Sequence, residues 1–158
     1  MRGMYSPLRL SAVLVTLFLL LFPGEALFAE NNVDLPALIG LTLQEAHQSL
    51  GVPVEVYTLR GAEPEQDDVV FYYTNHLYLF WYENRVWQVR ADRRFSGQFF
   101  TLSMGTTRQQ AIEAMGRPVL EFPDSLVFHV EERGYPIQAR LYFDEEGLAD
   151  VYCFRGDL

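Results

Sequence analysis

The feature that most constrains the fold is an internal repeat. The segments 40–53 and 105–118 align without a gap, and six of their positions are identical. The identical pairs are Gly40 and Gly105, Thr42 and Thr107, Gln44 and Gln109, Ala46 and Ala111, Gly51 and Gly116, and Pro53 and Pro118. A repeat of this kind predicts that the same local structure forms twice.

Each copy carries the start and stop signals of a short helix. Thr42 and Thr107 are expected to cap the helix, because the residue three positions on, Glu or Gln, completes a capping box. Gly116 is expected to take a positive φ and end the second helix at Met115, and the following proline prevents continuation. A helix of about two turns is unstable alone and has to pack on another element.

Strand-forming sequence follows each helix. Runs rich in valine and aromatic residues, separated by short polar connections, predict strands at 69–73, 77–82, 86–90, 126–130, 137–143 and 148–154. The predicted fold is α+β, a tandem repeat of a short helix packed on a three-stranded antiparallel meander. The first repeat is expected at 30–90, a linker at 91–98 and the second repeat at 99–158.

Residues 1–29 have the layout of a secretory signal peptide. Two arginines precede an apolar run at 10–22, and small residues follow it. The run is shorter than the roughly 20 residues that span a bilayer. We therefore expect cleavage after Ala26 or Ala29, an exported protein in the periplasm or outside the cell, and no stable membrane anchor. A retained anchor is the alternative.

Charge and cysteine content exclude several partners. The chain has a net charge of −9 and contains no lysine, so nucleic acid and anionic membrane surfaces are not expected to bind. Cys153 is the only cysteine, and disulfides within one chain are excluded. We expect Cys153 to be a small buried apolar residue; pairing with another chain is the alternative. The oligomeric state is not predicted.

Catalytic and metal-binding patterns are absent from the sequence. His47, His76 and His129 are not at metal-ligand spacing, and one cysteine cannot build a structural zinc site. The sequence has no nucleophile elbow and no phosphate-binding glycine loop. We expect no enzymatic activity and no cofactor; an unrecognised hydrolase is the alternative.

The repeated motif, followed by strands that end in Leu-Tyr-Phe-Asp at 141–144, resembles the SmpA/OmlA (BamE-like) family. The resemblance is loose at 39–90 and closer at 104–151. A tandem pair of such units is also similar to beta-lactamase inhibitor protein-like folds. The resemblance implies helices on three-stranded antiparallel sheets, and binding of proteins or envelope scaffolding without catalysis.

A partner-binding face is predicted when the strands of the two repeats are aligned so that Tyr82 matches Phe143. In the second repeat the exposed row includes Arg140 and Tyr142, whereas in the first repeat the same row is apolar: Leu77, Leu79 and Trp81. An apolar sheet face needs a cover. The cover is either internal or a partner protein anchored by Trp81.

Two functions follow from these features. The first is an exported, non-enzymatic module that binds another envelope or secreted protein or acts as a scaffold. The second is an inhibitor or chaperone of a specific enzyme. The tripeptide Arg155-Gly156-Asp157 adds an adhesion motif at the end of the sequence.

Overall fold

The computed structural model of the protein describes residues 32–61 and 67–158. Both copies of the repeated motif form short helices, α3 (Leu43–Leu50) and α4 (Arg108–Met115). Reciprocal capping boxes begin both helices, and they join Thr42 to Glu45 and Thr107 to Gln110. The predicted helix starts are therefore confirmed. A third helix, α2 (Leu35–Leu38), begins at Asp34, whose side chain accepts a hydrogen bond from the backbone N–H of Ala37.

Glycines end α3 and α4 at a positive φ with an extended ψ, a region of backbone space that is essentially restricted to glycine. Gly51 has a φ of 77° and Gly116 a φ of 83°. The N–H of Gly116 donates to the carbonyl of Ile112 at 2.8 Å, which closes the last turn. The positive φ predicted for Gly116 is confirmed.

Replacing Gly116 by valine should lower the free energy of unfolding by about 1–2 kcal/mol. A Cβ atom at this position would meet no atom within 4 Å, so the cost is backbone strain alone. Urea denaturation measures it, with Arg117→Val as the control, since Arg117 is exposed and does not have a positive φ. An Arg117→Val variant that loses as much stability as Gly116→Val would contradict this explanation.

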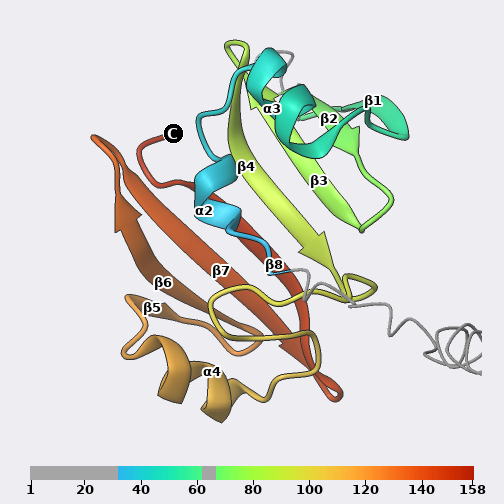
Figure 1. The fold of residues 1–158 in the computed structure, drawn as a ribbon. Helices are drawn as coiled ribbons and strands as arrows, with labels where there is room; N and C mark the ends of the chain where they lie inside the picture. The colour runs from blue at the N-terminus through green and yellow to red at the C-terminus, as the bar shows by residue number, and fades with distance from the viewer. Residues whose placement is uncertain (1–31, 62–66) are drawn as a thin grey trace, which may run out of the picture.

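The sheet has eight strands in the order β1-β2-β3-β4-β8-β7-β6-β5, and all neighbours are antiparallel. The strands are β1 (Glu55–Leu59), β2 (Asp68–Tyr72), β3 (Leu77–Tyr82), β4 (Arg85–Asp92), β5 (Leu120–Glu121), β6 (Ser125–Glu132), β7 (Pro136–Asp144) and β8 (Gly147–Arg155). β4 and β8 meet at the centre, with Val89 opposite Cys153. Figure 1 shows the two groups of strands joined along this pair.

The predicted fold class is wrong. The chain forms one continuous antiparallel sheet, not two repeats of a helix on a three-stranded meander. Two strands were missed, β1 and β5, and the pairing of β4 with β8 was not expected. This pairing satisfies backbone groups that two separate meanders would leave open at their edges. β4 also extends to Asp92, inside the predicted linker 91–98.

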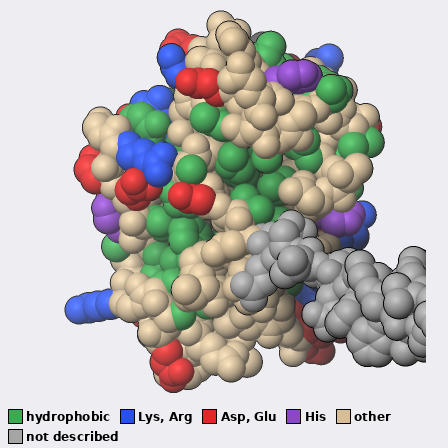
Figure 2. All heavy atoms as spheres, viewed as in Figure 1, with side chains coloured by type: hydrophobic (Ala, Val, Ile, Leu, Met, Phe, Trp, Pro, Cys, Tyr) green, Lys and Arg blue, Asp and Glu red, His purple; other side chains and the backbone are tan. Residues whose placement is uncertain are grey.

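The three described helices lie on one side of the sheet, which we call the covered face (Figure 1). A row of buried residues crosses the sheet there, with each residue opposite the next: Leu79, Val89, Cys153, Ala139 and Phe128. Leu35 from α2 and Phe99 from the segment after β4 pack on the same core and are fully buried. Figure 2 views this side and shows apolar side chains in its middle.

Cys153 is buried in this core, as predicted, and burial raises the pKa of its thiol far above the usual range. A protonated, inaccessible thiol is a poor nucleophile.

No described helix is both long and apolar enough to cross a bilayer. The predicted signal peptide, residues 1–29, lies outside the described residues.

Candidate partner-binding face

The structure separates the five predicted site residues between the two faces of the sheet. Leu77 and Leu79 are fully buried in the core beneath the helices, and Trp81 is partly buried beside them. Arg140 and Tyr142 lie on the opposite face, which we call the open face. The shared binding row predicted from the sequence is therefore wrong. For the three residues of β3, the cover is internal.

The error is a register shift of one residue. Four residues share a face because they lie opposite one another in successive strands: Leu79, Val89, Cys153 and Ala139. In the correct alignment of the two repeats, Trp81 and not Tyr82 therefore matches Phe143. Side chains alternate along a strand, and a slip of one residue exchanges the two faces.

Trp81 fills a position at the rim of the covered face. Its ring packs on Phe71 with centroids 5.0 Å apart, and together with Leu43 of α3 it lines a shallow depression of about 340 Å³. Its indole N–H has no hydrogen-bond partner among residues 32–61 and 67–158. Trp81 is therefore packed against the core of the protein on the covered face.

A row of large polar-aromatic residues crosses the open face. Each of Tyr72, Tyr78, Arg90, Tyr152 and Arg140 lies directly opposite the next in five adjacent strands, from β2 to β7. Two more rings contact Arg140, those of Tyr142 and Phe122. We call these seven residues the aromatic–arginine band. Its members are partly exposed, apart from Phe122, which is exposed. No described helix covers them (Figure 1).

The band is held by stacking between rings and guanidinium groups. The rings of Tyr72 and Tyr78 are 4.9 Å apart, and Arg90 lies 5.1 Å from the Tyr78 centroid and 5.5 Å from that of Tyr152. Tyr152 meets Tyr142 edge to face at 5.7 Å. Cation–π contacts between partly desolvated groups stabilise such arrangements by about 1 kcal/mol each. These contacts therefore order the side chains of the band within the chain itself.

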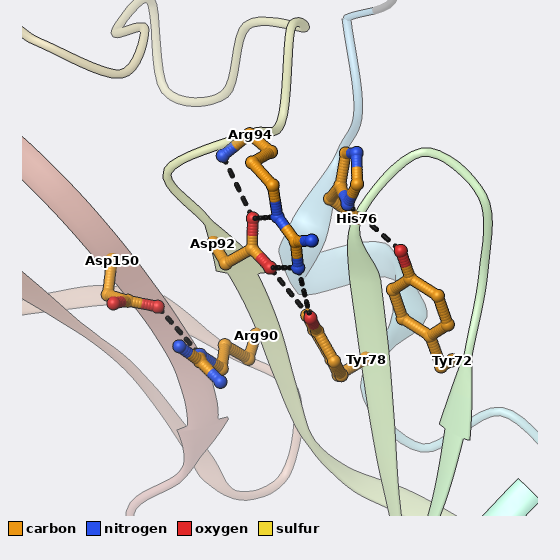
Figure 3. Close-up of polar contacts among 7 residues, drawn as sticks. All are labelled: Tyr72, His76, Tyr78, Arg90, Asp92, Arg94 and Asp150. Atoms are coloured by element: carbon orange, nitrogen blue, oxygen red, sulfur yellow. Dashed lines mark hydrogen bonds and ion pairs between the residues drawn. The ribbon is translucent and has the colours of Figure 1, made fainter. Parts of the chain in front are cut away.

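Carboxylates neutralise Arg90 of the band and Arg94 beside it (Figure 3). Arg90 Nε donates to Asp150 Oδ1 at 2.6 Å, across the β4–β8 pair. Arg94 makes two bonds to Asp92 with its side chain, and the hydroxyl of Tyr78 donates to the same carboxylate at 2.6 Å. These contacts fix the orientation of Arg90, Arg94 and Tyr78.

The environment shifts the proton affinities of this cluster. Burial, and then the hydrogen bond to Asp92, raises the pKa of Tyr78 to about 12. Burial alone would raise the pKa of Asp92, but the bonds from Arg94 and Tyr78 together hold that pKa well below its usual range. Both shifts favour the state in which a neutral phenol donates to a carboxylate.

The Asp92 cluster should make stability fall at low pH. Because the folded-state pKa of Asp92 is lowered, its contribution is present above the unfolded pKa of about 4 and is lost as the pH falls below it. Asp92→Asn should reduce the unfolding free energy at pH 7 by about 1–3 kcal/mol and should flatten the decline between pH 5 and pH 2.5. Urea midpoints across this range measure both effects.

The control for this prediction is Asp157→Asn, which removes an exposed carboxylate whose pKa is lowered by its bond from Arg155. We expect the control to keep nearly the wild-type pH dependence, because the pair is screened by solvent. A wild-type slope in Asp92→Asn would rule out Asp92 as the source of the acid sensitivity.

The adhesion tripeptide is folded onto itself. Arg155 makes two hydrogen bonds to the carboxylate of Asp157, at 3.1 and 2.8 Å, and its guanidinium lies 4.3 Å from the ring centroid of Tyr135. The N–H of Gly156 donates to the carbonyl of Pro136 at 2.8 Å. The arginine and the aspartate are paired with each other and not presented separately.

Within the part of the chain that the structure describes, no group of three or more histidine, cysteine or acidic side chains is placed to hold a metal ion. His76, at the β2–β3 turn, shares a hydrogen bond of 3.0 Å with the hydroxyl of Tyr72 through Nδ1. This contact ties the turn to the end of the band (Figure 3).

Comparison with protein-family models, with curated proteins and with solved structures finds no match to this chain. The resemblance of segment 105–118 to the SmpA/OmlA (BamE-like) family therefore stays a prediction.

Proposed function

We propose that the protein is an exported, non-enzymatic module that binds another envelope or secreted protein through its open face. The observation that supports this is the aromatic–arginine band, which crosses five strands on the side of the sheet that no described helix covers. Export rests on the signal peptide predicted for residues 1–29.

The composition of the band favours protein recognition. Tyrosine, tryptophan and arginine are the residue types that carry most of the binding energy at protein interfaces. Tyr78, Arg90 and Tyr152 lie in contact on three adjacent strands, and Trp87 reaches the same face, where its indole N–H donates to Asp68 at 2.9 Å. An interface of this kind can bury large rings at its centre and leave polar groups at its rim.

The order of the side chains supports the same function. Binding normally costs about 0.5–1.5 kcal/mol for each side chain that becomes fixed. Arg90 is already fixed by Asp150 and two tyrosine rings, and Tyr78 by Asp92 and Arg94. The surface is therefore prepared for binding with little further ordering.

Capture of a partner from the native envelope and secreted fractions tests the proposal. The immobilised protein should retain a discrete partner, and Tyr152→Ala should weaken retention at least about tenfold, since a central tyrosine is a typical binding hot spot. The matched control is Leu43→Ala, a side chain 55% exposed on the covered face, which should retain the partner. Thermal melts establish that both variants are folded.

Equal capture by wild type and Tyr152→Ala, or loss of capture only in Leu43→Ala, would overturn the assignment of the open face. If the captured partner is an enzyme, its turnover with and without the protein separates simple binding from inhibition.

A further inference from the structure

We propose that Arg140 and the depression beside it form a carboxylate-binding site, which receives an acidic side chain of the protein partner. This inference rests on the proposed function and specifies the chemistry that the partner presents. It commits to one occupant: a glutamate or aspartate next to an apolar residue on the partner's surface.

The guanidinium of Arg140 is held in place by aromatic rings. Its central carbon lies 4.5 Å from the centroid of Phe122 and 5.1 Å from that of Tyr142. Its Nε donates to the hydroxyl of Ser125 at 3.3 Å, and Ser125 is fully buried. Stacking fixes the plane of the fork and leaves the terminal N–H groups available for a planar acceptor.

Arg140 differs from its neighbours because it is not neutralised. Arg90 and Arg94 pair with Asp150 and Asp92, whereas Arg140 has no ion pair within residues 32–61 and 67–158. The structure connects it to a carboxylate only through Ser125, whose hydroxyl donates to Asp124 at 3.2 Å. In a chain with a net charge of −9, a partly buried cation that makes no direct ion pair with any described residue is a complement for an external anion.

The space beside Arg140 suits an acidic side chain with an apolar neighbour. A depression of about 450 Å³ lies between Arg140 and the rings of Trp87, Tyr152 and Phe154, with the amide of Gln88 in its wall. The rings beside the guanidinium lower the local polarity, which strengthens a charge-assisted hydrogen bond. The amide supplies a second donor for the same acceptor.

The test uses a small probe that does not depend on the partner. The ¹⁵N-labelled protein is titrated with N-acetyl-phenylalanyl-glutamate amide and, as the matched control, with the corresponding glutamine peptide. We expect the side-chain N–H signals of Arg140 and Trp87 to shift with the glutamate peptide only, with a dissociation constant of about 1–10 mM. Arg140→Gln should abolish the shift of the Trp87 signal.

Two further variants make the result specific. Arg108→Gln removes an arginine that lies over Phe143 outside the band, and it should keep the wild-type response. Arg140→Lys keeps the charge but not the fork, and it should bind the glutamate peptide several-fold more weakly than wild type. This conservative variant also preserves the test if Arg140→Gln does not fold.

The outcomes distinguish this site from the proposed function. Equal shifts with both peptides, no shift, or a shift that survives in Arg140→Gln would overturn the carboxylate site, and the capture experiment with Tyr152→Ala would be unaffected. A dimer in sedimentation that the glutamate peptide dissociates would assign the site to a second copy of this chain and overturn the proposed occupant. Partner capture weakened about tenfold by Arg140→Gln supports the inference.

Discussion

Replacing Phe99 by alanine should lower the free energy of unfolding by about 3–5 kcal/mol, the cost typical of a phenylalanine removed from a tight core. Phe99 is fully buried in the segment that follows β4, and its ring lies 6.0 Å from that of Phe95 and 6.1 Å from that of Phe100. This segment connects the two groups of strands, and the cavity would open where the core of each group continues into the other. Urea denaturation at pH 7 measures the change as a lower midpoint with an unchanged m-value.

The matched control is Phe122→Ala, which removes the same number of atoms from a ring that is 38% exposed. We expect this control to lose about 1 kcal/mol, because the ring is already partly exposed and the main loss is its cation–π contact with Arg140. A loss below about 1 kcal/mol for Phe99→Ala, or equal losses for both variants, would show that the segment does not complete the core.

Gly147→Ala should be as damaging as a large cavity, for a steric reason. Gly147 begins β8 with a φ of 101°, and a Cβ atom there would lie 2.4 Å from the carbonyl oxygen of Gly105 and 2.7 Å from its carbonyl carbon. Both are backbone atoms in the strand-like contact in which Gly105 donates to the carbonyl of Leu148. We expect a loss of about 3 kcal/mol or more, from positive-φ strain and overpacking together.

Gly134→Ala separates the two contributions. Gly134 also has a positive φ, of 76°, but a Cβ atom added there would meet nothing within 4 Å. It should lose only about 1 kcal/mol, the strain without the clash. Thermal and urea unfolding of the two variants, measured together, give the difference. Equal losses would mean that the backbone at Gly105 moves away from residue 147 with no measurable loss of stability.

Local signals in the sequence predicted the helices well. The capping threonines and the terminal glycine depend on neighbours within four residues, so α4 was predicted with its observed bounds, Arg108–Met115. Runs rich in valine and aromatic residues also located β3 and the three long strands of the second half. β1 was missed although it contains valine, tyrosine and threonine, because it follows a proline and leads into a polar stretch.

The sheet order and the site required information that is not local. Nothing near β4 in the chain indicates that its partner is β8, because that pairing joins residues far apart in the sequence. The band was missed for a related reason: Tyr78 and Arg90 become neighbours of Tyr152 only across this pair. An alignment anchored on the hairpin turns at Glu83 and Glu145, which match when Trp81 is aligned with Phe143, would have placed β3 on the correct face.

The central pairing of β4 with β8 also has a consequence for the order in which the protein folds. β8 is synthesised after the seven other strands of the sheet, so β4 has one unpaired edge until residues 147–155 are available. Closing this pair requires a long loop to be ordered first, which raises the relative contact order and slows folding. Until residues 147–155 have been synthesised, we expect the open edge of β4 to be the place where the nascent chain is most prone to pair with another chain.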